Sequence, residues 1–456
     1  MTTFFLSDAA AQFGGTLLNP DAKCDSFSID SRKIKHGDIF VALSGEHYDG
    51  HEFIDGIANE IAGAIVTKPV FEKNFPQWVV KDSEKALGCM ASLKRNSFKG
   101  QTIAITGSSG KTTVKEFIFS ILKLCGSVHA TEGNLNNQIG LPLTLLALPE
   151  GTDYLVLEMG ARKAGDINYL CSLSRPDISL VNNIQNAHIG SFGDLGSIAN
   201  AKSEIYRSLP EHGVGVLNLD LDYSNEWKNL LGPRRCITFS AEDESADVLA
   251  INLKSDEHGC YKFDMRLSPS ATTLQDISIE LNVPGEHSVG NAIAAAACAL
   301  AAGAGIDQIK QGLQMVEPIS GRLMVKKLRS GGSLIDDSYN ANPESVKAAI
   351  NFLSTRPGIR IFVFGDMADL GNRALEFHCS VGDYALDSGI DAMLTLGCLS
   401  AHASKQFNGQ HFSSLDALRN YLSEFKDTSG LTFLVKGSRS SSMEKVVFML
   451  DSGEIL

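Results

Sequence analysis

The chain has 456 residues, of which 43% are hydrophobic and 20% charged, and its formal net charge is −13 at pH 7. This composition describes a folded globular protein rather than a disordered chain, and the length exceeds what one hydrophobic core supports, so two to four domains are expected. The negative charge argues against broad binding to nucleic acid or to anionic membranes. A phosphate-bearing substrate must therefore be held by local cations and backbone amides.

The opening segment, MTTFFLSDAAAQFGG, has neither a basic start nor a long apolar run, so no secretory signal is predicted. The most apolar stretch, residues 291–306, is built from alanine and interrupted by glycine, which predicts a buried helix rather than a membrane span. Nine cysteines are scattered singly without a Cys-x-x-Cys pair, which fits reduced thiols. We expect a cytoplasmic monomer without membrane insertion and without a nucleic-acid partner.

Residues 1–98 are predicted to form a small α/β module, because short apolar runs at 38–43, 64–67 and 78–80 alternate with glycine-bearing turns. A different pattern begins near residue 102. Strands are predicted at 102–106, 154–158, 178–183 and 214–219, and helices at 112–124, 164–171 and 197–207. Strands that alternate with helices indicate right-handed βαβ units and a mainly parallel sheet.

A second series of alternating strands and helices is predicted after Pro318. Strands are predicted at 333–336, 360–365, 391–396 and 432–436, and helices at 343–354, 375–387, 415–425 and 441–450. The fold class is therefore α/β with three domains. We place them at residues 1–98, 99–317 and 318–456: a small N-terminal module, a central P-loop ATPase-like domain with a parallel sheet, and a C-terminal Rossmann-like domain.

The segment that follows the 102–106 strand resembles a phosphate-binding loop and opens a helix. Small residues let backbone amides approach phosphate oxygens, and the helix N-terminus adds partial positive charge. Lys111 would reach the β and γ phosphates, and the Thr112 hydroxyl would bind magnesium. The usual first glycine is replaced by Ile105, and the alternative is a glycine-rich turn with a solvated lysine. The candidate nucleotide-binding residues are Gly107, Ser108, Ser109, Gly110, Lys111, Thr112 and Thr113.

Three further residues follow predicted strands or lie on a predicted helix. Glu158 ends a strand at the edge where ligands bind in parallel sheets, and it is either a magnesium ligand or a solvated carboxylate. His188 follows the next strand, and a lone histidine is more often structural than a ligand. Lys202 lies in a helical stretch, where a lysine is normally a surface residue. Neither of the last two supports a functional assignment alone.

Taken together and in this order, the loop 106–113, the segments 157–161 and 187–188, and the helix 199–205 resemble the Mur ligases. The resemblance implies that Glu158 and His188 hold Mg²⁺, and that Lys202 is carbamylated by carbon dioxide and helps to hold a second Mg²⁺. Members commonly have a glutamate two residues after the histidine, whereas this chain has Gly190. No role is assigned to that position.

Several segments resemble the branch of this family that adds D-alanyl-D-alanine. The segments 365–371 and 435–444 carry this similarity, and the Asp-Asn-Pro-Arg signature of the diaminopimelate-adding branch is absent from the chain. The resemblance implies nucleotide contacts from Asn291, Arg322 and Asp337, with Asp336 as the second choice. The implied substrate-binding residues are Ser31, Arg32, Asn134, Asn136, Asn137, Lys436, Ser438 and Arg439.

The resemblance implies an ATP-dependent ligase with ATP and Mg²⁺ as cofactors, and UDP-N-acetylmuramoyl-tripeptide and D-alanyl-D-alanine as substrates. It implies an acyl phosphate intermediate, with the last domain closing over ATP. One alternative is folylpolyglutamate synthase, which shares the ATP site but lacks the UDP-binding first domain. Another is a nucleotide-regulated binding protein without catalysis, against which the four residues Lys111, Glu158, His188 and Lys202 argue.

Overall fold

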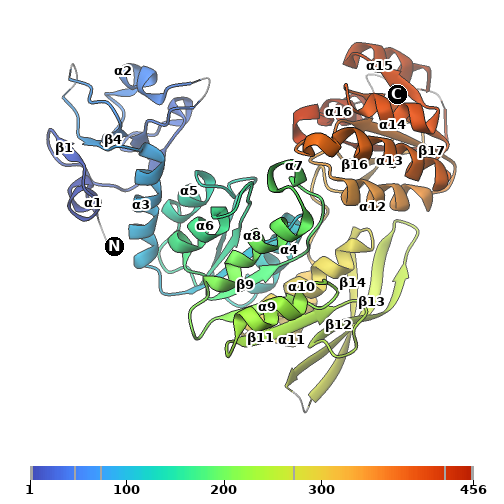
Figure 1. Cartoon of the computed structure of the whole chain (residues 1–456), viewed down its shortest axis with the longest axis horizontal. Coiled ribbons are helices and arrows are strands. Elements are labelled where there is room, and N and C mark those ends of the chain that lie inside the picture. Colours follow the sequence, from blue (N-terminus) through green and yellow to red (C-terminus); the bar gives the residue numbers. More distant parts are fainter. Residues whose placement is uncertain (1–3, 46–47, 72–73, 271–272, 426–427, 453–456) are drawn as a thin grey trace.

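The computed structural model describes residues 4–45, 48–71, 74–270, 273–425 and 428–452. The outer domain limits predicted at residues 1 and 456 lie outside these ranges. The described residues form three separate sheets, each flanked by helices (Figure 1). The three-part α/β fold expected from the sequence is confirmed, whereas the positions where one domain gives way to the next stay predictions.

The first sheet has the order β1-β5-β4-β3-β2, with β2 to β5 parallel and β1 antiparallel. Helices α1 and α3 share the apolar cluster of one face, and α2 shares the cluster of the other. The elements are α1 Leu6–Phe13, β1 Thr16–Leu18, β2 Phe27–Ser28, β3 Ile39–Val41, α2 Ile54–Ile57, β4 Gly63–Val66, β5 Gln77–Val79 and α3 Ser83–Asn96.

The central sheet has the order β14-β13-β12-β11-β10-β9-β6-β8-β7. Its elements are β6 Gln101–Thr106, α4 Lys111–Leu122, β7 Val128–Ala130, α5 Gly140–Leu146, β8 Tyr154–Glu158, α6 Asp166–Ser174, β9 Ile178–Val181, α7 Ile189–Phe192, α8 Leu195–Arg207, β10 Val214–Asn218, α9 Ser224–Leu231, β11 Arg235–Ser240, β12 Val248–Ser255, β13 Cys260–Ser270, β14 Thr273–Pro284, α10 His287–Ala301 and α11 Ile306–Gln314.

The residues of β6 show how this sheet is covered on both faces. Ile103 and Ile105 join the buried cluster of α4, α10 and α11, and Ala104 between them joins the cluster of α5, α6, α8 and α9. This alternation follows from the two-residue period of a strand. A strand buried on both faces reads as a continuous apolar run, which is why its position could be predicted.

The third sheet has the order β15-β16-β20-β17-β18-β19, parallel except for β15. Phe362 and Phe364 face α12, α13 and α14, and Ile361 and Val363 face α15 and α16. The elements are β15 Met324–Lys327, β16 Ser333–Asp337, α12 Pro343–Ser354, β17 Ile359–Gly365, α13 Ala374–Asp387, β18 Ala392–Leu396, α14 Ser400–Phe407, β19 Gln410–Phe412, α15 Leu415–Leu422, β20 Leu431–Lys436 and α16 Glu444–Asp451.

Two differences between the structure and the sequence-based expectation concern the central domain. The strands β12, β13 and β14 form antiparallel hairpins at one edge of the central sheet, in a region where no strand was predicted. The alanine-rich helix α10 begins at His287 and ends at Ala301, five residues before the predicted end. Gly303, at φ 88°, ends this apolar run because a left-handed backbone stops a helix.

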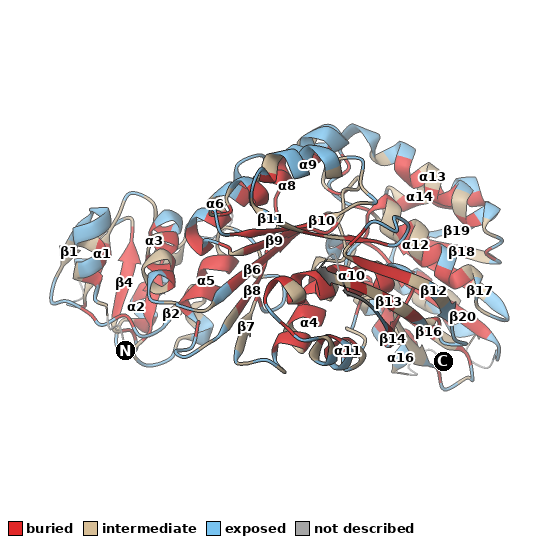
Figure 2. Cartoon of the chain, turned by 90° about the horizontal axis from the view of Figure 1, so that it is seen from below, coloured by how far each residue is buried: buried red, intermediate tan, exposed pale blue. Residues whose placement is uncertain are grey.

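Figure 2 shows α10 coloured as buried, in keeping with twelve buried residues along it. None of the helices in the described ranges combines the length and apolar character needed to cross a bilayer. The buried helix predicted in place of a membrane span is therefore confirmed.

Candidate active site

A cleft of about 680 Å³ lies between the central and third domains. Seventeen of the predicted site residues line it, which brings together side chains from distant parts of the sequence. They are Ser108, Ser109, Gly110, Lys111, Thr112, Thr113, Asn134, Asn136, Asn137, Glu158, His188, Lys202, Asn291, Arg322, Asp337, Lys436 and Arg439.

The phosphate loop lies between β6 and α4, as predicted. Gly110 adopts a left-handed conformation (φ 73°) immediately before α4, and a side chain there would meet Asn291 Oδ1 at 2.4 Å. The N–H groups of residues 110–113 donate to no other described residue and line the cleft. An open helix N-terminus of this kind binds anions.

Lys111 folds back over the loop. Its Nζ donates to the carbonyl oxygens of Gly107 (2.8 Å) and Ser108 (3.4 Å). Burial lowers the pKa of Lys111, and Glu158 opposes this decrease as a neighbouring negative charge. Carbonyl oxygens are weak partners for an ammonium group, so a phosphate oxygen can take their place.

Two asparagines that were not among the predicted site residues hold the phosphate loop in its conformation. Asn183 Oδ1 accepts from the N–H groups of Ser108 (3.1 Å) and Ser109 (2.9 Å). Asn182 donates from Nδ2 to Ser109 O (3.1 Å) and to Asn291 Oδ1 (3.0 Å). Their position in the sequence could have indicated this role, because two adjacent polar residues end a predicted strand. The carboxyl ends of parallel strands form the edge of the sheet where ligands bind.

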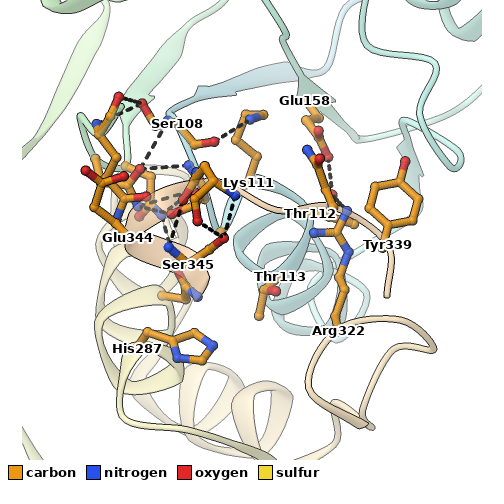
Figure 3. Close-up of a pocket in the computed structure, with 18 of the residues that line it drawn as sticks. Ser108, Lys111, Thr112, Thr113, Glu158, His287, Arg322, Tyr339, Glu344 and Ser345 are labelled. Carbon is orange, nitrogen blue, oxygen red and sulfur yellow. Dashed lines mark hydrogen bonds between the residues drawn. The ribbon is translucent and has the colours of Figure 1, made fainter. Parts of the chain in front are cut away.

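Glu158 is buried and connects three segments of the chain. Its Oε2 accepts from the Thr112 hydroxyl (2.7 Å), and its Oε1 accepts from Asn136 Nδ2 (2.7 Å). Arg322 from the third domain donates from Nη2 to Thr112 Oγ1 (2.8 Å), and its guanidinium stacks 4.5 Å from the ring centre of Tyr339 (Figure 3). Glu158 makes no ion pair with a described residue, so its negative charge is available to a bound cation.

Lys202 is buried in α8, not on the surface where a helical lysine normally lies. Within the described ranges its amine makes neither a hydrogen bond nor an ion pair. Burial lowers its pKa from the ordinary value of 10.5 to about 7, and the positive charge of Lys111 adds to the decrease. A buried amine without partners is costly to the fold, which points to a function rather than a structural role.

We expect Lys202→Met to be more stable than the unaltered protein, with a difference that depends on pH. Between about pH 7 and 10.5 the unfolded chain holds the lysine proton and the folded chain releases it, so the unaltered protein gains stability as pH rises through this window. Methionine carries no proton, so its advantage is largest below pH 7 and shrinks towards pH 10.5. Urea unfolding at pH 6.5 and 9 in carbon dioxide-free buffer measures this, and equal differences would contradict it.

His188 precedes α7 in a left-handed conformation (φ 57°). Its Nδ1 lies 2.9 Å from Asp369 Oδ2 of the third domain. Burial lowers the pKa of His188, and the charge of Lys111 lowers it further. The neutral imidazole is therefore favoured, and this is the form that binds a metal ion.

The third domain brings a lysine–aspartate pair to the cleft. Lys436 Nζ donates to Asp337 Oδ2 (2.6 Å) and to Asn340 O (2.9 Å). Asp336, the second choice from the sequence, is buried and accepts from the Gly321 N–H (2.9 Å) and the Ser338 hydroxyl (2.6 Å). Asp337 lines the cleft and Asp336 does not, and a nucleotide contact by either residue stays a prediction.

Four predicted site residues do not line the cleft. Gly107 belongs to the phosphate loop but does not line the cleft, and Ser31 and Arg32 belong to the first domain, where Arg32 is exposed and pairs with Asp30. Ser438 is buried, and its hydroxyl donates to the carbonyl oxygen of Asp366 (2.7 Å). Substrate contacts by Ser31, Arg32 and Ser438 stay predictions.

The predicted Mg²⁺ site offers few donor atoms of its own. No group of three or more His, Cys, Asp and Glu side chains that could hold a metal gathers anywhere in the described part of the chain. Glu158 and Thr112 nevertheless place two oxygen atoms 2.7 Å apart beside the phosphate loop. Mg²⁺ prefers oxygen ligands and usually takes some of them from substrate phosphates and water, so a sparse protein set fits this ion.

Known proteins resemble this chain over nearly its whole length. The family description "Mur ligase middle domain" matches residues 105–299, and "Mur ligase, glutamate ligase domain" matches residues 321–439. A UDP-N-acetylmuramoyl-tripeptide–D-alanyl-D-alanine ligase of Escherichia coli is 39% identical over 449 residues, 98% of each chain. A crystal structure of MurF from Acinetobacter baumannii has a TM-score of 0.91 with 32% identity over 99% of each chain. MurF from Thermotoga maritima, solved with ADP, has a TM-score of 0.81 with 28% identity, covering 94% of this chain and 97% of that one.

The phosphate loop, the buried carboxylate and the third domain that reaches into the same cleft define an ATP-dependent ligase of three α/β domains. The chain belongs to the Mur ligase family.

Proposed function

We propose that this protein joins D-alanyl-D-alanine to UDP-N-acetylmuramoyl-tripeptide with the consumption of ATP, as a step in making the peptidoglycan precursor. The observation that carries the proposal is a cleft in which a phosphate loop lies together with side chains of the third domain. Full-length similarity to ligases with this name supports the choice of substrates, and a relative solved with ADP supports the nucleotide.

The reaction proceeds in two stages. A carboxylate oxygen of the tripeptide attacks the γ-phosphorus of ATP, ADP leaves, and an acyl phosphate forms. The amine of D-alanyl-D-alanine then attacks the acyl carbon, and phosphate leaves as the amide bond forms. A carboxylate has no good leaving group, so phosphorylation supplies one at the cost of ATP.

The cationic side chains of the cleft act on the first stage. Lys111 exchanges its loop carbonyls for β and γ phosphate oxygens, and Arg322 approaches the same phosphates from the third domain. Positive groups held in place before reaction stabilise the charge that spreads over the transferring phosphoryl group. Glu158 and Thr112 would hold Mg²⁺, with His188 as a further ligand. The bound ion would supply additional positive charge there.

Lys202 is proposed to act in its carbamylated form. An amine whose pKa is about 7 is substantially neutral near pH 7, so its lone pair can attack carbon dioxide. A nitrogen–carbon bond forms, one C=O π bond of carbon dioxide breaks and the nitrogen loses a proton to water, which converts the neutral amine into a carbamate anion. That anion would serve the second Mg²⁺ and offset the positive charge of Lys111.

The remaining predicted residues are proposed for substrate contacts. Asn134, Asn136 and Asn137 line the cleft next to Glu158, on the side proposed for the UDP-linked peptide. Lys436 and Arg439 line the side formed by the third domain, where the dipeptide would bind. ATP and nucleotide-linked precursors are cytoplasmic compounds, so we propose a cytoplasmic location for the protein. We also propose that it acts as a monomer.

Phosphate release from ATP tests this function. It is measured with UDP-N-acetylmuramoyl-tripeptide in the presence and absence of D-alanyl-D-alanine, and the product is weighed by mass spectrometry. We expect amide formation to require both substrates and the product mass to rise by one dipeptide. Turnover with folate and glutamate, and none with these substrates, would overturn the proposal.

A further inference from the structure

Residues 365–371, with the sequence Gly-Asp-Met-Ala-Asp-Leu-Gly, have no role in the chemistry proposed above, yet the third domain holds them firmly. Asp366 Oδ1 accepts from the N–H groups of Leu399 (3.0 Å) and Ser400 (2.7 Å). The next residue, Met367, donates its N–H to His378 Nε2 (2.9 Å), and His378 is fully buried. A loop fixed at its base in this way presents its tip in a defined position.

The tip of this loop lies against α7 of the central domain. The Gly190 N–H donates to the carbonyl oxygen of Asp369 (3.0 Å). A side chain at Gly190 would place its Cβ 2.4 Å from the Gly371 nitrogen and 2.8 Å from the Gly371 Cα. The two backbones therefore approach as closely as they do only because neither residue has a side chain.

Apolar side chains accompany this backbone contact. Ile189 and Ile198 of the central domain are buried in the same cluster as Met367 and Leu370 of the third domain. Figure 1 shows α7 extending from the central domain towards the C-terminal one. Burial of these side chains supplies the attraction, since apolar area removed from water stabilises an interface.

The same tip reaches the side chain of His188, the predicted metal ligand. His188 is 31% exposed and Asp369 47% exposed, so their 2.9 Å contact contributes little to stability. Its effect is on orientation, because a carboxylate on one ring nitrogen fixes the ring and leaves the other nitrogen free for a ligand. The left-handed backbone of His188 needs such support from its surroundings.

We propose that residues 366–371 seat the third domain on α7, and that Asp369 is a positioning residue that orients His188 only when this contact is made. The inference deepens the proposed function, on which it rests. It makes docking of the third domain a condition for completing the site beside the phosphate loop.

Gly190→Ala tests the docking contact. Gly190 is not in the left-handed region, so alanine brings no backbone strain, but its methyl group cannot fit against Gly371. We expect small-angle scattering to show a larger radius of gyration and kcat to fall about 10-fold. Gly56→Ala, in helix α2 with no atom within 4 Å of the added Cβ, is the matched control and should change neither. Scattering and kcat like those of the unaltered protein in Gly190→Ala would overturn the proposal.

Asp369 is tested by a double-mutant cycle. Asp369→Ala should lower kcat about 10-fold with little change in KM for ATP, and Asp369→Asn should recover most of the rate because its amide oxygen still accepts a hydrogen bond. In the Gly190→Ala background, Asp369→Ala should add less than about twofold, since the contact is already lost. An equal loss in both backgrounds would overturn the coupling. Scattering needs no turnover, so failure of the ligase assay alone remains distinguishable from failure of docking.

Discussion

Lys111→Ala is expected to lower the rate of acyl phosphate formation by about 10³-fold, because it removes from the γ-phosphate the ammonium group of the first residue of α4. The N–H groups of residues 110–113 remain, so ATP should still bind, and the loss should fall on kcat more than on KM. Single-turnover quench with labelled ATP measures the chemical step directly.

The control for this change is Lys123→Ala, a lysine at the other end of the same helix. Lys123 is exposed and lies 5.8 Å from the ring centre of Phe119, away from the cleft. Its replacement should leave the rate within about twofold of the unaltered enzyme, as expected for a surface residue. If Lys111→Ala kept more than a tenth of the rate, the loop would bind nucleotide without Lys111 contributing to catalysis.

The parts of the fold that could be predicted are those with a strong local signal. The strand Tyr154–Glu158 and the helix Pro343–Ser354 match their predicted bounds, because an apolar run buried on both faces and an Asn-Pro helix start are local patterns. The hairpins β12 to β14 gave no such signal. Their exposed faces carry charged pairs such as Lys262–Glu280 and Arg266–Asp276, so their apolar content is diluted.

The residues of the candidate site also differ in how far the sequence could predict their roles. The phosphate loop was predicted from its own residues, whereas Glu158, His188 and Lys202 gained meaning only through their order along the chain. Sequence alone gave no reason to bury Lys202, since burial depends on how α8 packs on the sheet. The contact of Asp369 with His188 joins residues 181 positions apart and depends on the placement of two domains, which no local pattern encodes.

Activity is expected to depend on carbon dioxide through Lys202. Lys202→Ala should lower turnover by about 10³-fold, because it removes both the buried amine and the carbamate formed on it. The unaltered enzyme should lose activity in carbon dioxide-depleted buffer and regain it on addition of bicarbonate, whereas Lys202→Ala should respond to neither change. Lys228→Ala, a change at an exposed lysine of α9, should behave like the unaltered enzyme.

The carbamate on Lys202 can also be detected directly by NMR. With ¹³C-labelled bicarbonate, the unaltered enzyme should show a carbamate carbon signal that is absent from Lys202→Ala. A short carboxylic acid, which carries the same anionic group, should restore part of the activity of Lys202→Ala by entering the space left by the side chain. Full activity of the unaltered enzyme without carbon dioxide, together with no carbamate signal, would show that Lys202 acts as an amine. The lowered pKa of Lys202 would then favour a neutral amine in the site, and no carbamate anion would form.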